Sequence, residues 1–235
     1  MISPNRDLSW GDLPNARDLG GLPARDGITE RGRIFRSASP DTLDAIGWSA
    51  IASAGVTTVV DLRNDDEVRA AAFRPSSISV ARRPIEDRSD AEFMAEWGDR
   101  LGTPVYYAEI LDRWPGLVAA AVMTIADAPG GAVLLHCASG QDRTGMIAAI
   151  VLQVAGVERD AILSDYAAGV RGNNQWWRVN GEPGDAMSDD QLTQRLREIL
   201  PLLEAFLDGV DLDQYLLDSG VTVEQLNRLR ARLLN

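Results

Sequence analysis

The chain has 235 residues, 45% of them hydrophobic, and a formal net charge of −12 at neutral pH. Its length and apolar content predict a single globular domain over residues 1–235, and its charge argues against nucleic-acid or anionic-membrane partners. We find no apolar run of membrane-spanning length and no conventional signal peptide, so we expect a cytoplasmic protein.

Helix and strand patterns alternate through the first part of the chain. They predict a helix over 42–54, a strand over 56–62, a short helix over 65–73 and a strand over 78–85. Such alternation is typical of an α/β fold with a central, mainly parallel sheet flanked by helices.

The segment 88–114 combines aromatic and acidic side chains. Two interpretations stay open for it. The segment is either a lid that covers the pocket and stacks on a phenyl ring, or an ordinary pair of helices packed on the sheet.

Apolar patterns in the second half predict a helix over 117–126, a buried strand over 131–135, and helices over 144–155 and 158–168. Turn-forming residues over 172–184 predict a long loop, which we place at the rim of the pocket.

Residues 188–235 predict a helical C-terminal part. Ser188 with Gln191, and Thr222 with Gln225, have the spacing of capping boxes at helix starts. The apolar residues that follow each pair recur at helical spacing, and we assign them to the core.

Cys137, the only cysteine, opens a polar loop between the predicted strand 131–135 and helix 144–155, in the run HCASGQDRTG. At such a turn, loop amides and the helix N-terminus can hold a phosphate dianion and favour the thiolate form of the cysteine. Arg143 adds a planar fork of donors for two phosphate oxygens. The predicted phosphate loop comprises Ala138, Ser139, Gly140, Gln141 and Thr144.

Three neighbouring side chains have candidate roles. Asp142 can protonate a leaving oxygen and later activate water, and the Thr144 hydroxyl can donate to the sulfur. His136 is the only histidine, which excludes a histidine metal cluster, and we interpret it as a buried ring that braces the loop. We expect neither a metal nor a cofactor.

Arginines at four positions are candidates for a local basic pocket: Arg17, Arg36, Arg63 and Arg143. Acidic residues surround Arg63 in the sequence. For that residue, an ion-paired turn with Asp61 and the acidic residues at 65–67 is favoured over contact with substrate.

These motifs resemble the cysteine-dependent protein tyrosine phosphatases, in particular the bacterial branch that includes atypical tyrosine and lipid phosphatases. The similarity covers most of the chain. Beyond the loop motif it extends to the segments NARDLGG at 15–21, RGRIFRSA at 31–38 and VVDLR at 59–63 with Glu67 following, and to the end of the chain from 215 to 229.

The resemblance implies a tyrosine phosphatase-like fold and a two-step reaction without metal. Cys137 would form a phosphocysteine, and water would then release phosphate. The aspartate within the loop, here Asp142, commonly acts as the acid in this branch. Other tyrosine phosphatases use an aspartate on a separate loop, and Asp87 or Glu86 is the alternative here.

One departure concerns the substrate. The branch often has lysine before the loop aspartate, where this chain has Gln141, and a neutral amide suits a second phosphate poorly. We therefore expect a phosphotyrosine protein as substrate. The alternatives are a small phosphorylated metabolite or inositol phosphate, and a non-catalytic module that binds phosphorylated partners.

Overall fold

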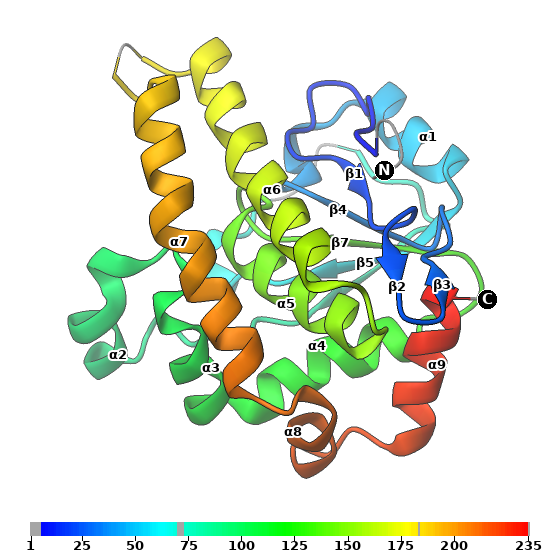
Figure 1. Cartoon of the computed structure of the whole chain (residues 1–235). Coiled ribbons are helices and arrows are strands. Elements are labelled where there is room, and N and C mark those ends of the chain that lie inside the picture. The colour runs from blue at the N-terminus through cyan, green and yellow to red at the C-terminus, as the bar shows by residue number, and fades with distance from the viewer. Residues whose placement is uncertain (1–5, 70–72, 183, 235) are drawn as a thin grey trace.

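The computed structural model describes residues 6–69, 73–182 and 184–234. Its strands in the main sheet are β1 (Arg17–Asp18), β4 (Ile34–Ser37), β5 (Val56–Asp61), β6 (Ser79–Arg82) and β7 (Ala132–His136). They lie in the order β1-β4-β7-β5-β6 (Figure 1). Only the β1–β4 pair within this sheet is antiparallel, which confirms the prediction of a mainly parallel sheet.

The central strand β7 is buried along its whole length, as its unbroken apolar sequence predicts. The strand register places Ser37 of β4 and Asp61 of β5 on either side of His136. The carboxyl ends of three parallel strands therefore meet at one edge of the sheet. The loop that begins at Cys137 leaves from the middle of this edge.

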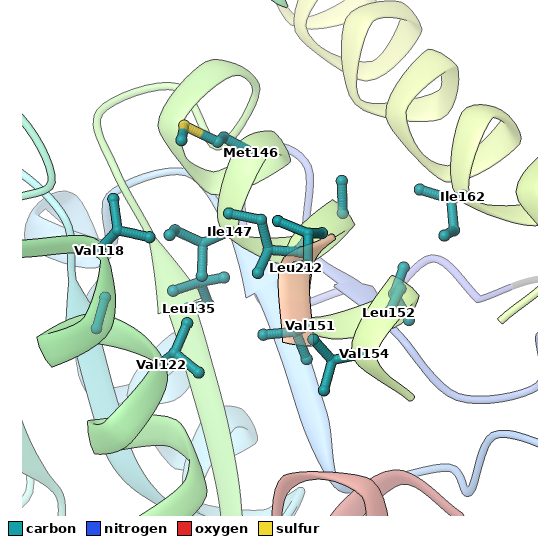
Figure 2. Close-up of a cluster of buried hydrophobic side chains, with 14 of the residues drawn as sticks. Val118, Val122, Leu135, Met146, Ile147, Val151, Leu152, Val154, Ile162 and Leu212 are labelled. Atoms are coloured by element: carbon teal, nitrogen blue, oxygen red, sulfur yellow. The ribbon is translucent and has the colours of Figure 1, made fainter. Parts of the chain in front are cut away.

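Helices cover both faces of the sheet (Figure 1). On one face, α1 (Ala45–Ser53) contributes Trp48 to a cluster that includes Leu134. On the other, α4 (Pro115–Asp127) and α5 (Asp142–Val154) pack on the neighbouring residue Leu135 (Figure 2). This alternation along β7 follows from the two-residue period of a strand, and it splits the core into two layers.

The C-terminal part is helical, as predicted. It contains α7 (Asp189–Gly209), α8 (Leu212–Asp218) and α9 (Val223–Leu234). Ser188 and Gln191 form a capping box at the start of α7, and Thr222 and Gln225 exchange the same pair of bonds before α9. None of the described helices is both long and apolar enough to span a bilayer.

The prediction of a long loop over 172–184 is wrong for residues 172–180, because α6 (Arg159–Asn180) continues through them. The reason lies in packing. A Cβ atom at Gly172 would lie 2.2 Å from Oδ1 of Asn15, so this glycine allows a close approach between α6 and the N-terminal segment. Glycine that marks close packing looks the same in sequence as glycine that marks a turn.

Two other elements are shorter than predicted. The helix expected over 65–73 is a single 3₁₀ turn, η2 (Asp65–Glu67), and residues 70–72 lie outside the described part. The strand expected over 78–85 is limited to β6 at the edge of the sheet.

The segment 88–114 contains α2 (Ala91–Trp97) and α3 (Tyr107–Arg113), joined by short 3₁₀ turns. Phe93 and Tyr106 are completely buried in the main core. The segment is therefore a packed helical pair, and its action as a lid stays a prediction.

Candidate active site

Cys137 lies in a strand-loop-helix turn between β7 and α5, as predicted, and only 2% of it is exposed. The helix begins at Asp142, two residues earlier than expected. Its first turn therefore contains both Asp142 and Arg143, and its N-terminal amides point toward the loop that begins with Cys137.

Groups outside the loop bind three successive carbonyls of the loop. The Ser39 amide donates to the carbonyl of Ala138 (2.9 Å), and the Asn15 side chain donates to that of Ser139 (2.9 Å). Arg36 donates to the carbonyl of Gly140 (2.7 Å). With the carbonyls turned outward, the loop amides are arranged as an anion-binding nest.

Gly140 has a specific steric role in this loop. Its φ is 69°, and a Cβ atom there would lie 2.4 Å from the backbone of Ser37. Only glycine fits both the left-handed conformation and the close contact with β4.

Arg17 and Arg36 are paired with a buried carboxylate, which corrects the prediction that they form a basic pocket with Arg63 and Arg143. Both pair with the buried carboxylate of Asp165 on α6, at 3.0 and 2.6 Å, and Arg6 joins them at 2.8 Å. Burial alone would raise the pKa of Asp165, but the three guanidinium groups hold it well below its ordinary value. Arg36 links this ion cluster to the loop through Gly140, so the cluster supports the loop from behind.

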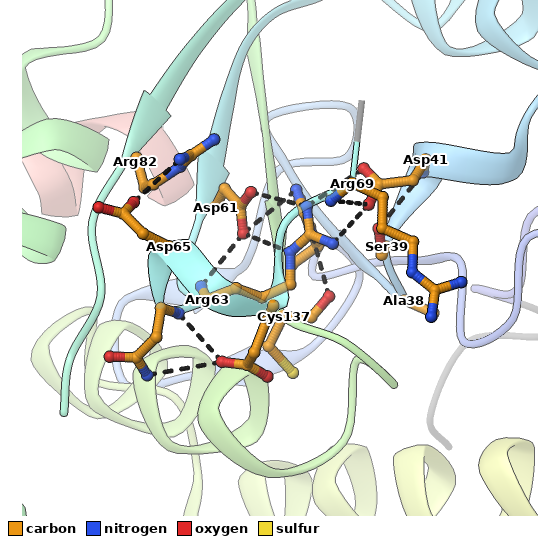
Figure 3. Close-up of polar contacts among 12 residues, drawn as sticks. Ala38, Ser39, Asp41, Asp61, Arg63, Asp65, Arg69, Arg82 and Cys137 are labelled. Carbon is orange, nitrogen blue, oxygen red and sulfur yellow. Dashed lines mark hydrogen bonds and ion pairs between the residues drawn. The ribbon is translucent and has the colours of Figure 1, made fainter. Parts of the chain in front are cut away.

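Arg63 is also ion-paired, and Asp61 is one partner as predicted, but the second partner is Asp41 and not one of the acidic residues at 65–67. Its guanidinium contacts Asp61 at 2.8 Å and Asp41 at 2.6 Å (Figure 3). Beside it, the buried His136 donates from Nδ1 to the carbonyl of Cys137 (3.0 Å), and burial lowers the pKa of the imidazole. These contacts fit the predicted role of His136 as a brace.

Arg143 is held by a carboxylate that the sequence analysis assigned elsewhere. Glu67 accepts from both terminal nitrogens of Arg143, at 2.5 and 2.6 Å. Burial opposes the ionisation of Glu67, yet the hydrogen bonds and charge of Arg143 lower its pKa to about 2. Its position after the VVDLR segment is the only sequence signal, and that position by itself favours pairing with the nearer Arg63.

The carboxylate of Asp142 is enclosed by the segment 102–107. Oδ2 accepts from the Gly102 amide (2.9 Å) and from the Tyr106 hydroxyl, and Oδ1 accepts from the Tyr107 hydroxyl (2.8 Å). Burial raises the pKa of Asp142, while the two tyrosine hydrogen bonds act in the opposite direction. The sequence indicates only that the segment 88–114 is rich in aromatic and acidic residues, and its local spacing does not predict these contacts.

The alternative acids differ in position. Glu86 is completely buried, 3.6 Å from Nε of Arg143, and burial raises its pKa. Asp87 is exposed and accepts from the amide and hydroxyl of Ser89 (2.9 and 2.6 Å). Of the two alternative acids, only Glu86 lies beside a residue of the turn that contains Cys137 and Arg143.

A sequence profile described as the tyrosine phosphatase family matches residues 8–235. The chain belongs to this family.

Two relatives of similar length, from Cupriavidus necator and Mycobacterium tuberculosis, support the assignment to the tyrosine phosphatase family. A Cupriavidus necator protein that bears the name of a tyrosine-protein phosphatase is 31% identical over 96% of this chain and 88% of its own. The triple specificity protein phosphatase PtpB of Mycobacterium tuberculosis is 26% identical over 95% of this chain and 98% of its own. Among solved structures, Pseudomonas aeruginosa TpbA matches 81% of this chain and 88% of its own, with 22% identity and a TM-score of 0.44.

Two further loop residues of this tyrosine phosphatase have defined surroundings. The amide oxygen of Gln141 accepts from Asn173 on α6 (3.0 Å). The Thr144 hydroxyl is buried and has no hydrogen-bond partner among the described residues, so it is available for the predicted bond to sulfur. Among all the residues that the structure describes, no group of three or more His, Cys, Asp or Glu side chains could hold a metal ion.

Proposed function

We propose that this tyrosine phosphatase hydrolyses phosphotyrosine in proteins through a phosphocysteine intermediate on Cys137, without a metal ion. The observation that carries the proposal is the loop itself. The buried Cys137 lies at the N-terminus of α5, and Arg143 is fixed in the first turn of the same helix. Membership of the family supports the same chemistry.

In the first step, the Cys137 thiolate attacks phosphorus and the bond to the tyrosine oxygen breaks. Asp142 gives its proton to that leaving oxygen. In the second step, water attacks the phosphocysteine while Asp142 takes a proton from it. The sulfur–phosphorus bond then breaks, inorganic phosphate leaves, and the thiolate is regenerated.

Arg143 and the loop amides together stabilise the charge on the phosphoryl oxygens in both steps. Glu67 engages one N–H on each terminal nitrogen, so the remaining N–H groups of the guanidinium are left for phosphate oxygens. Because the arginine is oriented before substrate binds, little reorganisation is needed as charge develops on the phosphoryl group.

Phosphotyrosine is favoured over an inositol phosphate because the cations near the loop are already paired. Arg36 and Arg63 are bound by carboxylates, and Gln141 contributes only neutral hydrogen bonds. Arg143 is itself paired with Glu67 and keeps only its remaining N–H groups for one phosphate. A substrate with several phosphates would therefore find no unpaired arginine among these three for a second phosphate.

The test is phosphate release from a phosphotyrosine peptide in the presence of excess chelator, with Cys137→Ser as the comparison. We expect turnover by the native chain and a loss of more than about 10⁴-fold in the variant. The serine variant should still bind the peptide. Equal turnover by the two chains would contradict a cysteine nucleophile, and release from an inositol phosphate alone would contradict the substrate assignment.

A further inference from the structure

Three buried hydroxyl groups form a connected chain beside Asp142. Tyr106 and Tyr107 contact its carboxylate, and Tyr166 of α6 lies 3.2 Å from the Tyr107 hydroxyl. All three tyrosines are at most 1% exposed. The hydroxyls thus come from two parts of the chain: those of Tyr106 and Tyr107 contact the carboxyl group directly, and that of Tyr166 reaches it through Tyr107.

Both oxygens of Asp142 are satisfied when the group is a carboxylate. Oδ1 accepts from Tyr107, and Oδ2 accepts from Tyr106 and the Gly102 amide. Tyr166 can then donate to the oxygen of Tyr107, whose single proton is directed to Asp142.

The same atoms also satisfy Asp142 when it is protonated. An O–H on Oδ1 needs an acceptor, and the Tyr107 oxygen at 2.8 Å is one. Tyr107 can turn its own proton to the backbone carbonyl of Asp142 (2.9 Å) or to the Tyr166 oxygen. A backbone amide such as that of Gly102 has no such freedom, because it can only donate.

We propose that Tyr106, Tyr107 and Tyr166 form a hydroxyl cradle that positions Asp142 and satisfies it in both protonation states of the acid–base cycle. The inference rests on the proposed role of Asp142. The three tyrosines are positioning residues, since they act on Asp142. When Asp142 gives its proton to the leaving oxygen, Tyr107 redirects its proton to Oδ1, and when water returns a proton, the direction reverses.

Other charged groups also face this network. Asp142 interacts electrostatically with Arg143 of α5 and with Glu86, which follows β6. Tyr166 interacts electrostatically with Arg36 of β4 and with Arg195 of α7. A test must therefore change one hydroxyl while leaving these charges in place. Replacing tyrosine by phenylalanine does this.

The decisive measurement is a carbon-13 NMR titration of the Asp142 carboxyl group in the full chain. Cys137→Ser serves as the parent, and Asp142→Asn identifies the signal. Because the Tyr106 hydroxyl stabilises the carboxylate, Tyr106→Phe should move the titration upward by about one pH unit. Tyr107 donates to the carboxylate and accepts from the acid, so Tyr107→Phe should move the titration upward by less than Tyr106→Phe does. Tyr215→Phe is the matched control, because that hydroxyl donates to the carbonyl of Leu111 (3.0 Å), away from Asp142.

A second measurement uses the chain with Cys137 intact. The alkaline limb of kcat/KM reports loss of the proton from the acid, so it should move upward with the titration in Tyr106→Phe and stay fixed in Tyr215→Phe. Tyr166→Phe, which removes only the outer hydroxyl, should give a smaller shift in the same direction. It also provides a second variant should Tyr106→Phe fail to fold.

The outcomes separate the two proposals. Titrations that coincide in Tyr106→Phe, Tyr107→Phe and Tyr215→Phe would overturn the cradle, whatever the activity. A shifted titration in a protein whose native form releases no phosphate from the peptide would support the cradle and reject the proposed function.

Discussion

At the residue scale, Glu67 fixes the orientation in which Arg143 can donate to a phosphate bound at the loop. The two side chains form a bidentate pair in which Arg143 is 4% exposed. Lysine could not form this pair and still present a fork to substrate. Glu67 therefore holds the arginine that the chemistry needs, although the two residues lie 76 positions apart.

Glu67→Gln should lower kcat/KM for a phosphotyrosine peptide by about 10- to 100-fold, because the guanidinium loses its fixed orientation. The thiol itself is unchanged, so the rate of Cys137 alkylation at neutral pH should change much less than kcat/KM. Steady-state kinetics and alkylation by iodoacetamide measure the two quantities. Full activity in the variant would contradict the role assigned to Glu67.

The same carboxylate makes the stability of the fold depend on pH. Its folded-state pKa of about 2 is below the ordinary value of about 4.3. The stabilisation is thus fully present above pH ~4.3 and is lost as the pH falls toward 2. Urea denaturation should show a stability gap between native chain and Glu67→Gln at pH 7 that narrows at pH 3.

The control for this pH dependence is Glu224→Gln, which removes an exposed carboxylate paired with Arg228 on α9. Its effect on the free energy of unfolding should be below about 1 kcal/mol at either pH. A gap for Glu67→Gln that stays constant between pH 7 and pH 3 would contradict the linkage.

At the element scale, α6 supports the loop that begins at Cys137 from outside. Near its middle, Gly172 allows Asn15 to approach closely, and Asn15 in turn donates to the loop carbonyl of Ser139. Asn15 itself adopts a left-handed φ of 57°, a conformation that asparagine tolerates better than most residues. The long helix is thus part of the support of the site and does not form a loop at its rim.

Gly172→Ala should destabilise the fold by about 1–3 kcal/mol, because the new methyl group displaces Asn15. It should also reduce turnover, because a displaced Asn15 no longer holds the loop carbonyl of Ser139. Gly116→Ala in α4 is the matched control, since a Cβ atom there meets nothing within 4 Å, and we expect its stability to be unchanged or slightly raised. Urea denaturation of both variants measures the difference, and equal stability would contradict the steric account.

At the scale of the whole molecule, Asp165 joins three regions. It binds Arg6 and Arg17 from the N-terminal segment and Arg36 from β4, while it belongs to α6. All four side chains are buried. The cluster fixes the N-terminal segment, the sheet and the helical layer relative to one another, and through Arg36 it reaches the loop.

Asp165→Asn should destabilise the protein by about 3–5 kcal/mol, because three guanidinium groups remain buried without their counter-ion. Asp160→Asn, which changes an exposed residue in the first turn of the same helix, should cost less than about 1 kcal/mol. Thermal and urea unfolding compare the two. A similar small effect in both variants would show that water or other carboxylates replace Asp165.

The loop and its immediate elements could be predicted from sequence because the interactions that form them are local. An apolar strand, a glycine-containing turn and an apolar helix follow one another within residues 132–154. Cys137 and Arg143 belong to this one stretch, so their joint position needs no long-range information. The parallel sheet was predictable for a related reason, since alternating helices and strands leave few topologies.

The partners of the loop were decided only by the tertiary structure. Glu67 reaches Arg143, Tyr106 reaches Asp142 across 36 positions, and Asp165 gathers arginines from the other end of the chain. Periodicity and local spacing carry no information on such pairs, because many carboxylates and arginines are equally plausible partners before the chain folds. By itself, the sequence determined the fold class and the strand-loop-helix turn that contains Cys137 and Arg143, and the tertiary structure decided which side chains hold that turn in place.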